Sequence, residues 1–287
     1  MELSEPVSGY EPVPMVGSRD VLWSHRCSWV DLLVPVELAS GRGGLDLGEG
    51  WQERWSVTWR VEGEEVSSPL DRTLRGTLAG LEPMRGFTWR RAQRHRPGLP
   101  YMVSTGRLHG SESLEEAKLL LALDFDAQVT EIVSQPLRIC FTCAAGERDH
   151  TPDYLVRTRS GVWLIDVRPA ALIKDTDRES FAAAAEMARA CGWGFAVAAG
   201  WLPHVMVTLD WFSSQRRPKR DPLGVEPGLL AQVDLGTRTF GELAASSDYE
   251  PVARAQLLHL LWHRRLGLNL HEPLGDGCVI ASGEVRG

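Results

Sequence analysis

Two short apolar runs joined by a tight turn most constrain how this chain folds. Residues 154–156 and 162–167 are rich in β-branched and other apolar side chains, and Ser160-Gly161 lies between the runs. This pattern predicts a β-hairpin. Asp153 precedes the first run and Asp166 lies near the end of the second. The hairpin therefore brings two carboxylates to the same end, where they repel each other unless a cation lies between them.

The predicted pair of carboxylates suits a hard divalent cation. Magnesium takes oxygen ligands, usually one or two carboxylates together with water and substrate phosphate. Asp153, Asp166 and the backbone carbonyl of Val167 offer such oxygens. Mg²⁺ is therefore the predicted cofactor, and Mn²⁺ is expected to replace it.

A third carboxylate is expected from a Leu-rich helix over residues 113–123. Glu116 shares one helical stripe with Leu119, Leu120 and Leu123. A carboxylate on an apolar face is costly unless it pairs or binds a metal. The alternative is an amphipathic helix whose acidic first turn complements the helix dipole. The hairpin downstream favours the metal-ligand interpretation.

The order of these residues resembles the PD-(D/E)xK nuclease superfamily: a helix with Glu116, then Pro152-Asp153, then Asp166-x-Arg168. The surrounding residues are similar to the TnsA-like endonuclease subunits of heteromeric transposases, over about residues 85–200. The segments that carry this second resemblance are Glu112-Ser113-x-x-Glu116, residues 123–129, Gln135-Pro136-Leu137, His150-Thr151-Pro152-Asp153 and Gly192-Trp193.

The resemblance implies an α/β, restriction-endonuclease-like fold, with a mixed sheet flanked by helices. It implies Mg²⁺-dependent phosphodiester hydrolysis at the 5′ ends of a transposon, with Glu116, Asp153 and Asp166 as metal ligands. The implied partners are DNA, a DDE-type transposase that cuts the opposite strand, and an AAA+ ATPase that regulates both.

Position 168 departs from the family pattern, which has a lysine where this chain has Arg168. A guanidinium does not deprotonate in a protein, so Arg168 cannot act as a base. It is expected to hold the scissile phosphate or the attacking water. The proton then leaves from metal-bound water through a carboxylate or bulk water.

Three functions stay open at this point. The first is a strand-cleaving subunit of a transposition machine, and the second is a stand-alone defence or restriction-type nuclease. The third is a DNA-binding or assembly scaffold in which Arg168 has ended catalysis. Dependence on partner proteins separates the first two, because a stand-alone nuclease cuts DNA unaided. The chain contains neither a Walker A sequence nor a nucleophile elbow.

A strip without acidic residues, residues 84–110, precedes the predicted helix. Its arginines alternate with aromatic residues, and arginine matches phosphate geometry bidentately, so the strip predicts contacts to the DNA backbone. The alternative is a solvated pair of strands with arginines on its outer face. The predicted DNA-binding residues are Arg85, Arg90, Arg91, Arg94, Arg96 and Arg107.

Residues 1–83 are expected to form a Trp-rich, β-containing N-terminal module. Strands are predicted over residues 30–38 and 51–66, and a short helix over residues 71–81. Five tryptophans lie between positions 23 and 59. Such a set is more often the core of a small module than a platform for stacking bases.

Residues 84–200 are assigned to the nuclease core and residues 201–287 to a winged-helix-like C-terminal domain. By resemblance, the C-terminal domain docks the ATPase. A basic cluster at residues 216–220 follows its first helix. The predicted elements are helices at about 203–214, 239–245 and 251–266, and a strand–turn–strand wing over 270–280.

The composition bounds the remaining possibilities. The net charge of −7 argues against indiscriminate binding to nucleic acid, so any DNA contact must come from local basic patches. Five cysteines without framework spacing suit a reducing cytoplasm. Cys140-x-x-Cys143 lacks a second pair, which disfavours zinc. No apolar run is long enough to span a membrane.

Overall fold

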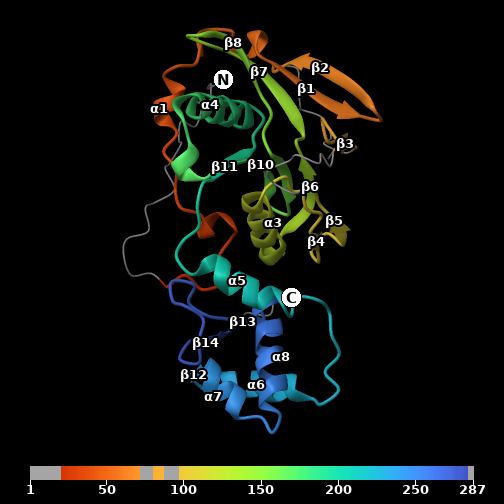
Figure 1. The fold of residues 1–287 in the computed structure, drawn as a ribbon, viewed down its shortest axis with the longest axis vertical. Helices are drawn as coiled ribbons and strands as arrows, with labels where there is room; N and C mark the ends of the chain where they lie inside the picture. The colour runs from red at the N-terminus through yellow and green to blue at the C-terminus, as the bar shows by residue number, and fades with distance from the viewer. Residues whose placement is uncertain (1–20, 72–79, 87–96, 284–287) are drawn as a thin grey trace, which may run out of the picture.

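The computed structural model describes residues 21–71, 80–86 and 97–283. Over these ranges the molecule is elongated, with two β-sheets and their helices at one end and a helical unit at the other (Figure 1). The helix predicted over residues 71–81 lies largely outside the described residues. So do four of the predicted DNA-binding residues: Arg90, Arg91, Arg94 and Arg96.

The first sheet joins strands from both sides of the boundary predicted at residue 83. Its order is β2-β1-β7-β8, and β3 also pairs with β1. β1 runs antiparallel to β7, with Val57 opposite Ile139. The predicted N-terminal module and the predicted core therefore share one sheet. The strands are β1 (Ser56–Val61), β2 (Glu64–Pro69), β3 (Leu81–Glu82), β7 (Leu137–Cys143) and β8 (Gly146–His150).

The second sheet contains the predicted hairpin and has the order β11-β10-β9-β6. β10 is antiparallel to β9 and parallel to β11, so this sheet is mixed, as predicted. The parallel pair needs a crossover, which α4 (Asp175–Ala190) supplies. The strands are β6 (Val129–Ser134), β9 (Tyr154–Thr158), β10 (Gly161–Val167) and β11 (Gly194–Ala198).

Helix α3 (Leu114–Asp126) covers the second sheet with its leucine stripe. Leu119, Leu120 and Leu123 are fully buried, in one cluster with Tyr154 and Ile165 of the hairpin. The apolar runs of β9 and β10 and the leucine stripe of α3 therefore meet in a single core. The hairpin predicted from those runs and the helix predicted from the leucine spacing are confirmed.

The strand predicted over residues 30–38 is wrong. The chain forms a short 3-10 helix, η1 (Val30–Leu32), and then an extended segment that makes one isolated bridge, between Leu33 and Trp201. Pro35 lacks the N–H that would continue a ladder. The strand predicted from residue 51 begins later, because Gly50, at φ +70°, precedes a turn of helix, α2 (Trp51–Arg54).

The tryptophans of the N-terminal part lie partly in the core, as predicted. Trp29 and Trp55 are buried, with 2% and 0% of their surface exposed. Trp55 stacks edge to face on Trp51 and lies against Phe141 of β7. The core interpretation is therefore confirmed for these side chains.

The C-terminal unit has one apolar core, and side chains from earlier parts of the chain also pack in this core. Phe125 of α3 packs in it, and so do Cys27 and Leu32 of the N-terminal part. The helix α6 was not predicted, and the winged-helix assignment stays a prediction. The elements are α5 (Val205–Ser213), α6 (Val225–Asp234), β12 (Arg238–Thr239), α7 (Phe240–Ala245), α8 (Glu250–Trp262), β13 (Leu266–Gly267) and β14 (Val279–Ser282).

Five short elements complete the described chain. They are α1 (Ala39–Arg42), η2 (Ala170–Leu172), β4 (Tyr101–Met102) and β5 (Arg107–Leu108), together with α2 given above. All five cysteines are free thiols. Cys143 is buried and Cys140 is half-buried, so alternate residues of β7 face the core. In the described part of the chain, none of the helices has the length and hydropathy needed to cross a bilayer.

Candidate active site

The hairpin brings Asp153 and Asp166 together, as the sequence predicted. Ile165 pairs with Tyr154, so one further step along both strands places Asp166 opposite Asp153. The N–H of Val167 donates a hydrogen bond to Asp153 Oδ2 at 2.7 Å. The N–H of Gln135 donates to the Asp153 carbonyl oxygen at 2.7 Å. Both the side chain and the backbone of Asp153 are therefore held in place.

The electrostatics of Asp153 reflect a crowded set of carboxylates. Burial, followed by the charges of Asp166 and Glu116, raises its pKa to about 8, although the hydrogen bond from Val167 acts in the opposite direction. A carboxyl group in such surroundings gains its charge readily when a cation is close by. The donor set consists of hard oxygens, so these residues fit a divalent ion such as Mg²⁺.

Glu116 lies in the first turn of α3, near this pair. Its carboxylate accepts hydrogen bonds from the Ser113 hydroxyl at 2.8 Å and the Glu112 N–H at 2.8 Å. The Tyr154 hydroxyl donates to it at 3.1 Å. Glu116 thus caps its own helix and also contacts the strand that follows Asp153. These contacts support the alternative in which Glu116 belongs to the acidic first turn of its helix.

The three carboxylates share one region without forming a ready-made metal shell. Among the described residues, no group of three or more His, Cys, Asp or Glu side chains is arranged to hold a metal ion. Glu116 is held by Ser113, Glu112 and Tyr154. Its role as a ligand beside Asp153 and Asp166 stays a prediction.

His150, at the end of β8, is a site residue that the sequence analysis did not assign. Its Nε2 lies 2.9 and 3.0 Å from the two carboxylate oxygens of Asp166. A carboxylate can only accept, so Nε2 carries the proton of this bond. Burial lowers the pKa of His150, but Asp166 outweighs burial and the pKa is raised. The ring also packs edge to face on Phe181 of α4.

Arg168 contacts the start of α4. Its Nε lies 3.5 Å from Asp177 Oδ2, and its side chain is 40% exposed. Its backbone N–H donates to the Ala198 carbonyl at 3.3 Å. Arg168 directly follows the last residue of β10, two positions after Asp166, and its charge is paired with Asp177.

Arg85 and Arg107 are the two predicted DNA-binding residues that the structure describes. Arg85 donates to Gln135 Oε1 at 2.6 Å and to Glu112 Oε2 at 2.7 Å. It therefore braces two segments that flank the acidic site, because Gln135 bonds to Asp153 and Glu112 bonds to Glu116. Arg107 lies on β5 and is exposed.

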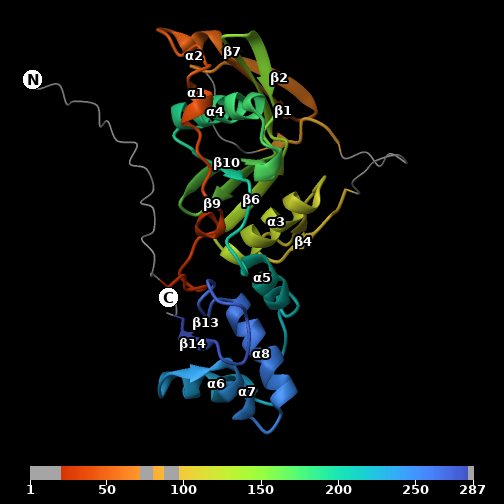
Figure 2. The same ribbon diagram turned by 60° about the vertical axis from the view of Figure 1, so that its left-hand side comes forward.

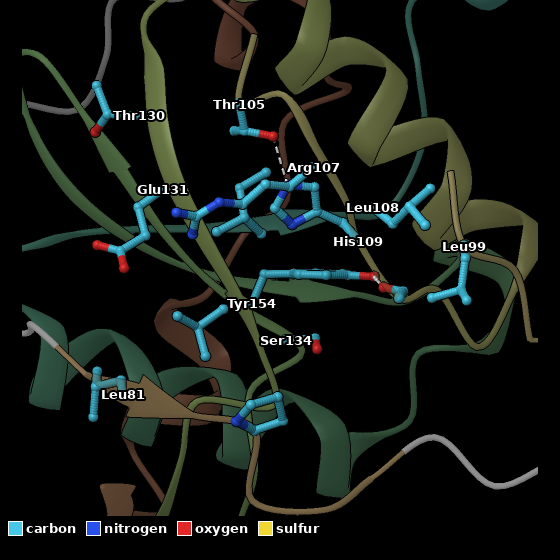
Figure 3. Close-up of a pocket in the computed structure, with 14 residues that line it drawn as sticks. Leu81, Leu99, Thr105, Arg107, Leu108, His109, Thr130, Glu131, Ser134 and Tyr154 are labelled. Atoms are coloured by element: carbon cyan, nitrogen blue, oxygen red, sulfur yellow. Dashed lines mark hydrogen bonds between the residues drawn. The ribbon is translucent and has the colours of Figure 1, made fainter. Parts of the chain in front are cut away.

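A cavity of about 320 Å³ lies beside the site, between the β4–β5 hairpin and β6 (Figure 3). Arg107, His109 and Glu131 line it, and the ring of Tyr154 forms part of its wall. The Tyr154 hydroxyl lies 2.8 Å from the Gly110 carbonyl oxygen and 3.1 Å from Glu116 Oε2, so its single proton is shared between the two acceptors. The cavity and the acidic site therefore share Tyr154.

Comparison with protein families bears on this geometry directly. Residues 126–199 match the family model described as TnsA-like endonuclease N terminal. This segment of the chain is similar to the N-terminal domain of TnsA-like endonucleases. The match begins at the last residue of α3 and includes Asp153, Asp166 and Arg168, whereas Glu116 lies before it. The resemblance predicted from the sequence is thus confirmed over this segment. A comparison with curated proteins gave no match.

Proposed function

We propose that this protein is a Mg²⁺-dependent DNA endonuclease subunit of a transposition system. It cleaves one DNA strand at transposon ends, together with a DDE-type transposase and an AAA+ ATPase. The observation that carries the proposal is the opposed pair Asp153 and Asp166 within the segment that matches the TnsA-like endonuclease model. The raised pKa of Asp153 supports it, because it marks a site in which negative charge lacks a counterion.

Each residue of the site has a role in this proposal. Asp153, Asp166 and the Val167 carbonyl would hold the ion, with Glu116 as a further ligand. When bound, Mg²⁺ supplies Lewis acidity to the phosphate and lowers the pKa of a coordinated water. The Val167 N–H orients the Asp153 carboxylate, and His150 orients that of Asp166. Arg168 would leave Asp177 to meet the scissile phosphate, since a guanidinium fork matches its oxygens.

A non-catalytic scaffold on the same fold is the second candidate. The ion pair between Arg168 and Asp177 favours it, because it occupies the side chain that the reaction needs. An exposed pair of this kind is worth at most about 1 kcal/mol, so binding of DNA could displace it. The contact therefore weighs less than the buried acidic pair.

Cleavage of DNA carrying a transposon end, in the presence of the two partner proteins, tests the proposal. Wild-type protein is expected to nick the DNA when Mg²⁺ is added, and Asp166→Asn is expected to leave it intact. Asp149→Asn is a matched control, because Asp149 is an exposed carboxylate one residue before His150. Equal cleavage by the wild type and Asp166→Asn would contradict the proposal. Intact DNA in every reaction would favour the scaffold.

A further inference from the structure

The loop between α5 and α6 concentrates positive charge. We call residues 216–220 the basic loop, because Arg216, Arg217, Lys219 and Arg220 fall within it. Within the described ranges, no carboxylate lies within ion-pair distance of these four side chains. Arg254, by contrast, forms an ion pair with Asp276 at 2.6 Å. The chain as a whole has a net charge of −7, so these four cations produce a local positive field of the opposite sign.

The acidic residues closest in sequence are engaged elsewhere. Asp221 accepts hydrogen bonds from the N–H groups of Val225 at 3.0 Å and Glu226 at 2.8 Å, at the start of α6. Glu226 pairs with Arg265 and also accepts from Gln256 at 2.6 Å. Burial lowers the pKa of Lys219, and the charges of Asp221 and Glu226 act in the opposite direction. The two carboxylates thus offset part of the charge of Lys219 without forming an ion pair with it.

The basic loop is held in shape by the helix beneath it. Lys219 Nζ donates to the Ala255 carbonyl at 3.0 Å. His259 Nδ1 lies 2.7 Å from the carbonyl oxygen of Gln215. An open cavity of about 410 Å³ lies within the segment 213–219. A concave and positively charged surface is thus formed before any ligand arrives.

This surface is connected to the nuclease domain. Arg216 Nη2 donates to the carbonyl of Tyr101 at 3.2 Å. Tyr101 lies on β4, whose partner β5 carries Arg107. The basic loop therefore touches the hairpin that lines the cavity beside Tyr154. Figure 2 shows α5, which leads into this loop, directly below α3 and β4.

We propose that the basic loop binds the phosphate backbone of the DNA duplex that flanks the cleavage site. The proposal rests on the proposed function, since it extends the DNA surface from Arg107 onto the C-terminal unit. Arginine forks suit phosphate oxygens, and fixed cations gain affinity by releasing counterions from DNA. The contact to β4 aligns the loop with the active site, which DNA requires and an acidic peptide does not.

The test measures how tightly a fluorescent DNA duplex binds the full-length protein. Fluorescence anisotropy reports the binding, which is measured at several salt concentrations without divalent cations. The variant Arg217→Ala/Arg220→Ala removes two charges and leaves Arg216 on Tyr101 and Lys219 on Ala255. Each phosphate contact contributes about 0.9 to the slope of log affinity against log salt. The double variant is therefore expected to lower that slope by about 2 and to weaken binding by on the order of 10-fold at moderate salt.

The matched control removes the same charge elsewhere. Arg159 and Arg238 are exposed residues outside the loop, and their double alanine variant is expected to bind like the wild type. Thermal unfolding of both variants reports whether they are folded. Duplex binding by the loop variant with wild-type affinity and salt slope would overturn the proposal. If a poly-glutamate peptide with the same total charge as the duplex displaced the duplex from the protein, the proposal would also be overturned, because the surface would then suit an acidic partner.

The duplex-binding test does not depend on the metal site, so the two proposals can fail separately. If Mn²⁺ fails to bind the wild type while the loop variant still loses duplex affinity, the proposed nuclease activity fails and the DNA surface stands. If Mn²⁺ binds while the loop variant keeps its duplex affinity, the DNA surface fails alone.

Discussion

His150 Nε2 lies 2.9 Å from Asp166 Oδ1, across the gap between the two sheets. His150 ends a strand of the first sheet, and Asp166 lies within the second. With only 3% of its side chain exposed, Asp166 has little access to water. The imidazole therefore sets the orientation of a carboxylate that the proposed mechanism uses.

Replacing His150 is expected to weaken metal binding. Partners that orient a ligand typically contribute 10- to 100-fold to metal affinity. His150→Ala should therefore lower Mn²⁺ affinity in a calorimetric titration by about tenfold or more. His150→Gln keeps an N–H donor and should recover part of the loss. Unchanged affinity in the alanine variant would contradict the orienting role.

The stability of the metal-free protein is expected to depend on Asp153. The folded state keeps this carboxyl group protonated up to a pH of about 8, whereas the ordinary pKa is 3.8. The folded state thus binds the extra proton between these values, so the contribution of Asp153 to stability falls as the pH rises from about 4 to about 8. Asp153→Asn removes this contribution.

Urea unfolding at about pH 5 and pH 8 without divalent cations measures the difference. The free energy of unfolding of Asp153→Asn should change less between the two pH values than that of the wild type. Addition of Mg²⁺ at the higher pH should stabilise the wild type and leave Asp153→Asn unaffected. Parallel pH dependence in the two proteins would rule out the electrostatic account of Asp153.

Arg168 is expected to act in cleavage and not in metal binding. It follows the acidic pair by two residues but contacts Asp177. Arg168→Ala should therefore bind Mn²⁺ with unchanged affinity and lose cleavage in the assay with partner proteins. Arg168→Lys, which restores the family's residue, should keep cleavage. If Arg168→Ala cleaves as well as the wild type, the side chain has no part in the reaction.

Arg264 is expected to stabilise the junction between the nuclease domain and the C-terminal unit. Its guanidinium donates to the carbonyls of Phe125 at 2.9 Å and Cys27 at 2.8 Å, and it stacks over the Phe125 ring. The side chain is 11% exposed. Arg264→Ala should cost about 3 kcal/mol or more of unfolding free energy, because it leaves buried acceptors unpaired.

The neighbouring residue is the control for this prediction. Arg265 is 47% exposed and pairs with Glu226 at the surface. Arg265→Ala should therefore cost no more than about 1 kcal/mol. Equal losses in the two variants, measured by urea unfolding, would show that Arg264 does not stabilise the junction.

The sequence predicted those parts of the site that depend on local patterns. The two apolar runs on either side of Ser160-Gly161 specified the hairpin, and its register then placed Asp153 opposite Asp166. The leucine spacing after Glu116 specified α3. These features need no knowledge of the remote chain, because strand period and helix period are set within a few residues.

Features that depend on remote pairing were missed. Nothing near Val57 indicates that its strand lies beside Ile139, and so the first sheet was divided between two predicted domains. The contact of His150 with Asp166 was missed for the same reason, since the two residues belong to different sheets. The motif His150-Thr151-Pro152-Asp153 did contain the signal, as a histidine beside a predicted ligand.

The most direct test of the metal site is a calorimetric titration of Mn²⁺ into the wild type, Asp153→Ala and Asp149→Ala. Mn²⁺ is expected to bind the wild type and Asp149→Ala but not Asp153→Ala, because Asp153 faces Asp166 while Asp149 is exposed. Equal Mn²⁺ affinity in the wild type and Asp153→Ala would contradict the assignment of the metal site.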